Sequence, residues 1–208
     1  MSLRIKQLFS TVVLFLILAI LPMGCEVFCN DPCGCRPKFE VKDFRITAFE
    51  TLSLAQDGQR IHPSLVLPYD QTTKSFRVAQ FETVAQSKES LGGLPGMAYA
   101  CSPIAPQSIH RLIGLQLINK KEVVLGDGTI LEVGKLLNEF VKMNYFSASE
   151  TFPLAEFLDG GLPVFSDDLF KLVWQKAPGK ELVLEFDLQI QLENGQGFVL
   201  PNEILSIR

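Results

Sequence analysis

Histidine is scarce in this chain, with only His62 and His110 among 208 residues. Histidine is the side chain whose ordinary pKa lies closest to neutral pH, so its scarcity removes most of the usual general bases. The chain also lacks a G-x-S-x-G nucleophile elbow and an H-E-x-x-H metal motif. His62 is expected to be a solvated loop residue, and His110 a residue at the rim of an apolar strand. The sequence therefore predicts no catalytic residue, cofactor or metal site.

An excess of positive charge is also missing. The 19 Lys and Arg residues are outnumbered by 23 Asp and Glu, and the formal net charge is −4. This balance argues against a nucleic-acid partner. The 47% hydrophobic content excludes a wholly disordered chain, and the length predicts one domain. Twelve Pro, fifteen Gly and sixteen Phe favour strands and turns over a helical bundle.

The N-terminus has the layout of a secretory signal. Arg4 and Lys6 precede an uncharged stretch that contains ten consecutive apolar residues, 12–21. The uncharged run 8–24 would span roughly 25 Å as a helix, which is short for a hydrocarbon core of about 30 Å. We therefore predict a signal peptide over residues 1–24, with an uncleaved membrane anchor as the alternative.

Cys25 follows this apolar run in the segment Leu21-Pro22-Met23-Gly24-Cys25. The segment is similar to a bacterial lipobox, in which a small residue precedes the cysteine that is lipidated. It departs from that pattern because Pro22 occupies the place where Leu is usual, and Met23 is larger than the usual residue before the Gly. We predict lipidation at Cys25, with an uncleaved anchor or another cleavage site left open.

Lipidation of Cys25 would leave four cysteines, Cys29, Cys33, Cys35 and Cys101, for disulfide bonds. Cys33 and Cys35 are too close in sequence for an easy bridge. Cys101 is therefore expected to pair with one of the other three, and the sequence does not select which. The spacing is a poor match to zinc sites, and an oxidising compartment favours disulfides. A Cys101–His110 catalytic dyad is an alternative use of Cys101, and the disulfide is favoured over it.

The rest of the chain divides into a Cys-rich tether, residues 25–38, and a β-rich domain, residues 39–208. The clearest strand is 182–192, where apolar and polar residues alternate over eleven positions. Asn194-Gly195 predicts a tight hairpin back into 197–200, with another strand at 204–207. Further strands are expected at 39–42 and 44–49, offset by a bulge at Lys42-Asp43, and at 65–67, 75–84, 97–101 and 109–118. The predicted fold is a mainly β, antiparallel sandwich-like single domain with one or two short helices.

One helix is predicted after Thr129, whose spacing from Glu132 is that of a capping box. Apolar residues recur at helical spacing from Ile130 to Val141, and Asn144 could end the helix. The competing interpretation is a hairpin about Asp127-Gly128 that pairs 122–125 with 129–133, and we favour the helix. A second helix of one or two turns is expected at 153–158, and Trp174 is expected in the core.

Two carboxylates, Glu185 and Asp187, fall on one face of the 182–192 strand, about 7 Å apart. That separation lies within the range of about 6.5–9.5 Å used by inverting glycosidases. The pair defines an alternative function, a surface hydrolase acting on glycans. A solvent-exposed strand face is the simpler explanation of the same residues.

The chain resembles a family of Bacteroidota lipoproteins that have an N-terminal cysteine cluster and no assigned activity. The resemblance is carried by the signal with its cysteine, Cys33-Gly34-Cys35-Arg36-Pro37, Tyr99-Ala100-Cys101-Ser102-Pro103, Leu136-Leu137-Asn138-Glu139-Phe140 and the C-terminal hairpin. It implies a protein anchored to a bacterial membrane through lipid on the extracytoplasmic side, with the outer membrane favoured. We expect a non-catalytic role in binding or envelope structure, with an envelope component or a glycan as a possible ligand.

Overall fold

The computed structural model describes residues 43–84 and 105–208. Strands dominate the described part, which contains one α-helix of four residues and a short 3-10 helix. The elements are β1 (Asp43–Ala55), β2 (Thr72–Thr83), β3 (Gln107–Ser108), β4 (Leu112–Asn119), β5 (Val123–Val124), β6 (Ile130–Leu131), η2 (Asn138–Phe140), β7 (Val141–Tyr145), β8 (Phe152–Pro153), α3 (Leu154–Phe157), β9 (Leu169–Trp174), β10 (Leu182–Leu192) and β11 (Gly197–Ile207). In these residues no helix has the length and apolar character needed to cross a bilayer.

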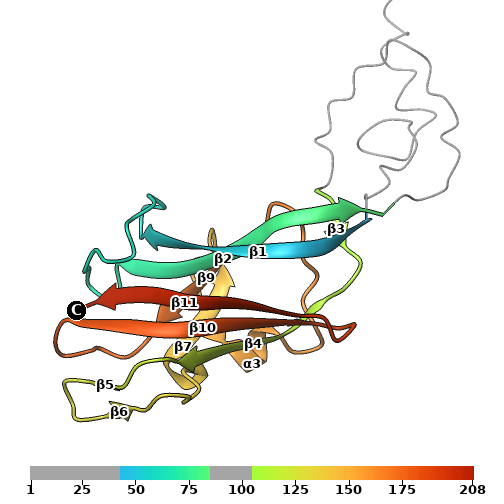
Figure 1. Ribbon diagram of the computed structural model, residues 1–208. Helices are drawn as coiled ribbons and strands as arrows, with labels where there is room; N and C mark the ends of the chain where they lie inside the picture. Colours follow the sequence, from blue (N-terminus) through green and yellow to red (C-terminus); the bar gives the residue numbers. More distant parts are fainter. Residues whose placement is uncertain (1–42, 85–104) are drawn as a thin grey trace, which may run out of the picture. The chain divides into compact units, whose positions relative to one another are not determined.

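The strands form two main sheets and one small one. A six-stranded sheet has the order β3-β1-β2-β9-β7-β8, and a three-stranded sheet has the order β11-β10-β4 (Figure 1). Almost all neighbours are antiparallel, and the exception is β3, which runs parallel to β1. The small sheet is the hairpin β5-β6.

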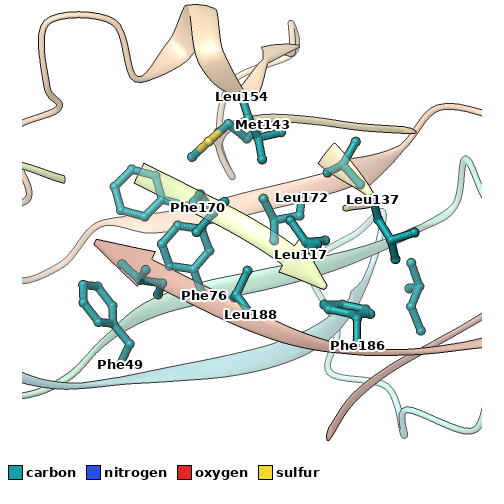
Figure 2. Close-up of a cluster of buried hydrophobic side chains, with 14 of the residues drawn as sticks. Phe49, Phe76, Leu117, Leu137, Met143, Leu154, Phe170, Leu172, Phe186 and Leu188 are labelled. Atoms are coloured by element: carbon teal, nitrogen blue, oxygen red, sulfur yellow. The ribbon is translucent and has the colours of Figure 1, made fainter. Parts of the chain in front are cut away.

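The hydrophobic core lies between the two main sheets. β10 contributes every second residue from Leu182 to Leu192 to the core. The larger sheet contributes the buried side chains Phe76, Phe170 and Leu172. All of these side chains belong to one hydrophobic cluster. Figure 2 shows part of it, with Phe186 and Leu188 of β10 near Phe76, Phe170 and Leu172, and with Leu154 of α3 at the border. The described residues therefore form one mainly β domain with sandwich-like packing, as the sequence predicts.

The C-terminal hairpin confirms the prediction from alternation, since β10 covers 182–192 and turns at Asn194-Gly195. The two return strands expected at 197–200 and 204–207 are instead one continuous strand, β11. The register shifts opposite Asp187, where Asn202 adopts a positive φ of 56° and donates its N–H to Asp187 Oδ1 at 3.0 Å. A bulge absorbs the Pro201-Asn202 interruption, so the strand continues.

The helix predicted from Thr129 to Asn144 is wrong, and the competing hairpin is correct. Val123 pairs with Leu131 and Val124 with Ile130. Asp127 Oδ1 accepts the N–H of Thr129 at 3.0 Å, which closes a turn at Asp127-Gly128 instead of capping a helix. Residues further along join η2 and β7, and β7 pairs with β9. Sheet pairing and burial of β7 therefore override the local helical periodicity.

Other boundaries differ in smaller ways. The short helix expected at 153–158 is confirmed as α3. Strand 75–84 is found as β2 and strand 109–118 as β4, whereas 65–67 contributes only a single bridge from Leu67 to Ile207. The strands expected at 39–42 and 97–101 lie outside the described residues, as does Lys42 of the predicted bulge. A register irregularity in β1 lies between Ile46 and Phe49.

Candidate ligand-binding groove

A groove of about 790 Å³ runs beside β4, an edge strand of the three-stranded sheet, and across the ends of β10 and β11 near their hairpin turn. Its opposite wall is α3 and the following loop, 158–161. This volume is within the range of about 300–1,000 Å³ that is usual for small-ligand sites. The groove is built by segments far apart in sequence, because the sheet brings β4 next to β10.

Three glutamine side chains line the groove from the two neighbouring strands. Gln116 of β4 lies directly opposite Gln189 of β10, and Gln191 lies opposite Gly114. The three fall on the outer face of the sheet because the neighbouring residues Leu115 and Ile190 point into the core. No side-chain hydrogen bond joins any of these amides to another residue of the described part. Their donors and acceptors are therefore available to a ligand.

The wall formed by Gly160 and Gly161 is fixed to β4. Arg111 Nη1 donates to both carbonyl oxygens at 3.2 Å, and the Leu112 and Leu162 backbones exchange hydrogen bonds of 2.9 and 2.8 Å. Gly161 has φ +79°, and a Cβ there would come within 3.2 Å of Arg111 Cβ. A side chain at this position would be both strained and crowded, so glycine lets the wall approach the strand closely.

Asn138 closes the neighbouring part of the β4 edge. Its Oδ1 accepts the N–H of Leu117 at 2.9 Å, and its Nδ2 donates to the carbonyl of Leu115 at 2.8 Å. The N–H of Leu137 also donates to the Leu117 carbonyl at 2.8 Å. The amide therefore takes the place of a neighbouring strand, which is one way to protect an exposed sheet edge from pairing with another chain.

The lining is nearly neutral. Asp159 is the one charged side chain among the described residues that line the groove. Two large apolar side chains of the lining are exposed, Ile113 at 44% and Val199 at 57%. The groove thus combines free amides, apolar patches and very little charge.

The carboxylate pair considered from the sequence lies elsewhere on β10 and does not line the groove. Glu185 is 3.0 Å from Lys121 Nζ, and Asp187 is 3.1 Å from Lys120 Nζ. The hydrogen bond from the Asn202 N–H is the main cause that lowers the pKa of the Asp187 carboxyl, and the Lys120 ammonium lowers it further. A glycosidase acid needs a raised pKa so that it carries its proton near neutral pH, and Asp187 is shifted the opposite way.

The other residues singled out in the sequence also lie away from the groove. His62 is exposed, with Nδ1 2.6 Å from Ser64 Oγ, and His110 is joined through its backbone to the Ser108 hydroxyl. Trp174 is buried in the core and stacks on Phe140 at 5.3 Å, as expected. Cys25, Cys29, Cys33, Cys35 and Cys101 lie outside the described residues. Within residues 43–84 and 105–208, no three His, Cys, Asp or Glu side chains are grouped as metal ligands.

The groove itself was not found by sequence reasoning. Alternation does place Gln189 and Gln191 on the polar face of 182–192, but it places Glu185 and Asp187 there as well. What separates the two sets is their partners. The carboxylates meet lysines, whereas the glutamines meet Gln116 and Gly114 of β4, a pairing that depends on long-range register.

Comparison with known proteins adds little to this geometry. No family model and no curated protein sequence matches the chain. Among solved structures, it is similar to the C-terminal domain of the Streptococcus agalactiae antigen I/II polypeptide BspA, with 16% identity and a TM-score of 0.28 over 77% of this chain and 49% of that one. The C-terminal domain of the Streptococcus pyogenes antigen I/II-family protein AspA gives 12% identity and a TM-score of 0.25 over 77% and 46%. The chain spans about half the length of these structures.

Proposed function

We propose that this protein is a non-catalytic binding protein, held on the extracytoplasmic side of a bacterial membrane by lipid on Cys25, and that the groove is its ligand site. The observation that carries the proposal is the set of three free amides in a groove whose described lining residues include a single charged side chain. Such a lining can hold a ligand by hydrogen bonds, and no other residue of it in the described part of the chain is a titratable group that could work with Asp159.

Asp168 has a raised pKa and Lys171 a lowered pKa, and neither residue lines the groove. Burial raises the pKa of Asp168, whose Oδ2 accepts the N–H of Phe165 at 2.7 Å. Burial lowers the pKa of Lys171, whose ammonium donates to the carbonyls of Phe146 and Ala148. Shifted pKa values often mark active sites, but both of these groups hold neighbouring turns together. This supports binding over catalysis.

Groove binding can be tested by filling the groove. Gly197 lines it and has an unstrained backbone, and a Cβ added there would come no closer than 3.9 Å to the Ile190 carbonyl. Gly197→Leu should therefore fold normally and occupy ligand space. The full chain in detergent micelles is incubated with purified peptidoglycan sacculi and with isolated envelope polysaccharides, and bound protein is measured by sedimentation or retention.

We expect Gly197→Leu to reduce binding to at least one of these fractions by tenfold or more. The matched control is Ala79→Leu, which adds similar bulk at an exposed position of β2 in the other sheet. Equal binding by both variants and the unmodified chain would contradict a ligand site in the groove. Release of soluble sugar from either fraction would contradict the absence of catalysis.

The anchor is tested separately. Two acyl chains hold a protein on a membrane firmly and one does so only marginally. Cys25→Ala should move the protein from the detergent phase to the aqueous phase on phase separation. An intact Met1 on the mature protein, seen by mass spectrometry, would contradict lipidation. We also propose a disulfide from Cys101 to Cys29, Cys33 or Cys35, and rapid alkylation of Cys101 in the unreduced, denatured chain would contradict it.

A further inference from the structure

The chemistry of the three groove amides indicates a class of ligand. Each glutamine offers two N–H donors and a carbonyl acceptor. A hydroxyl group both donates and accepts, so one amide can satisfy a hydroxyl in either role. Gln116 and Gln189 are directly opposed across two strands, and Gln191 is the next outward-facing residue along β10. Together they present a row of neutral donors and acceptors suited to a ligand with several hydroxyls.

Ionic ligands fit this groove poorly. No Lys or Arg is among the residues that line it, and Asp159 is its one charged side chain within the described ranges. Arg111 lies next to the wall, but its Nη1 already donates to the carbonyls of Gly160 and Gly161. An anionic ligand would therefore lose its hydration without gaining a charged partner. A cationic ligand would find only Asp159, an exposed carboxylate whose ion pairs contribute little, so the ligand is expected to be neutral.

An extended peptide also fits poorly. Peptides usually occupy such a position by adding a strand to the sheet edge through backbone hydrogen bonds. Here the backbone of Leu112 is already paired with Leu162, and Asn138 occupies the carbonyl of Leu115 and the N–H of Leu117. An added strand would find most of its partners at this edge taken.

The exposed apolar side chains favour sugar rings over smaller polar molecules. Ile113 and Val199 lie in the lining on either side of the glutamines, on β4 and β11. A pyranose ring presents hydroxyls around its rim and C–H groups on its faces, so it can meet amides and apolar side chains at once. Resting on the proposed function, we infer that the groove binds a neutral oligosaccharide whose hydroxyls hydrogen-bond to Gln116, Gln189 and Gln191.

The test uses calorimetric titration of the full chain in detergent micelles. The probes are neutral hexasaccharides of glucose, galactose, mannose and N-acetylglucosamine, an acidic hexamer of galacturonic acid, and an end-blocked neutral hexapeptide of Ser and Thr. The variant Gln116→Leu/Gln189→Leu removes two amides while keeping much of their bulk. Its matched control is Gln80→Leu, which makes the same change at an exposed position of β2. Gln191→Ala is a second, single variant for use if the double variant is unstable.

We expect at least one neutral hexasaccharide to bind, the double variant to bind it at least tenfold more weakly, Gln191→Ala to weaken it several-fold, and Gln80→Leu to leave it unchanged. Binding of only the acidic hexamer or the peptide, no binding of any neutral hexasaccharide, or undiminished binding by the glutamine variants would overturn the inference. Gly197→Leu separates the two claims. If it blocks a probe or envelope fraction that is not a neutral sugar, the groove is a site and only the ligand class is wrong. If it blocks nothing, the proposed function itself fails.

Discussion

A buried ion pair connects the two main sheets and gives a sharp test of the packing. Lys74 of β2 lies with its Nζ 2.6 Å from Glu203 Oε2 of β11, and the two side chains are 4% and 16% exposed. The Thr51 hydroxyl also donates to Glu203 Oε2 at 2.6 Å, and Lys74 Nζ donates to the Ile204 carbonyl at 3.4 Å. The pair is therefore enclosed and hydrogen-bonded on both sides.

The two single substitutions should differ in cost. Removing one partner of a buried ion pair costs about 3–5 kcal/mol because the other charge is left uncompensated. Glu203→Leu leaves the Lys74 ammonium with one long hydrogen bond, so we expect a loss of about 3–4 kcal/mol. Lys74→Met leaves a carboxylate that is partly exposed and still receives the Thr51 hydroxyl, so the loss should be about 2 kcal/mol.

The double variant Lys74→Met/Glu203→Leu replaces both charges with apolar groups, and its stability should lie within about 1 kcal/mol of the unmodified chain. Urea unfolding of the four proteins gives the coupling energy, with the sum of the single losses expected to exceed the double loss by several kcal/mol. Additive losses, or single losses below about 0.5 kcal/mol, would refute the argument that this pair is buried and mutually compensating.

Three further outcomes follow from individual contacts. The pKa of Asp187 is lowered in the folded state, so the ionised carboxylate stabilises the fold above its unfolded pKa of about 3.9. This stabilisation is lost as pH falls through the folded pKa. Urea midpoints across pH should therefore show the unmodified chain losing stability relative to Asp187→Asn on acidification. Burial raises the pKa of Asp168, so the pH dependence of its contribution to stability has the opposite sign. The same assay should show the unmodified chain losing stability relative to Asp168→Asn as pH rises from about 4 to 7. For either aspartate, parallel curves for the variant and the unmodified chain would contradict the prediction. Asn138→Ala removes the side-chain partners of the Leu115 carbonyl and the Leu117 N–H, so urea unfolding should show a loss of about 2–3 kcal/mol. The exposed edge should also promote self-association, measured by sedimentation velocity. A variant of unchanged stability that stays monomeric would contradict the edge-closing role.

The parts of the fold that the sequence predicts well depend on local signals. The strand 182–192 alternates without interruption, and Asn194-Gly195 specifies a tight turn, so both strand and hairpin are predictable from adjacent residues. The helix of residues 154–157 likewise lies inside its predicted range.

The segment 129–144 shows why other parts are not predictable. Its apolar residues fit a helical period, yet Val141 and Met143 are buried in a strand paired with β9, about thirty residues later in the chain. Asn119 also fixes the β5-β6 segment, because its Nδ2 donates to the carbonyls of Lys121, Leu131 and Glu132. The β7–β9 pairing and the bonds from Asn119 to Leu131 and Glu132 join residues twelve or more positions apart, so no local pattern contains them.

The groove is missing from the sequence prediction for the same reason. Glutamine has no distinctive motif, and Gln189 resembles any polar residue on an amphipathic strand. Its meaning depends on the register that sets it opposite Gln116 and on the loop that Arg111 fixes beside them. A site built from neutral side chains on separate strands becomes visible only when the sheet is assembled.

The most direct test of the groove as a neutral-sugar site is to follow the side-chain amide NMR signals of the glutamines while a neutral hexasaccharide that binds is titrated into the full chain in micelles. We expect the signals of Gln116, Gln189 and Gln191 to shift together and saturate at one affinity, with Gln80 of the other sheet unchanged. Shifts at Gln80 or elsewhere on the six-stranded sheet, with the three groove amides unmoved, would contradict the central claim.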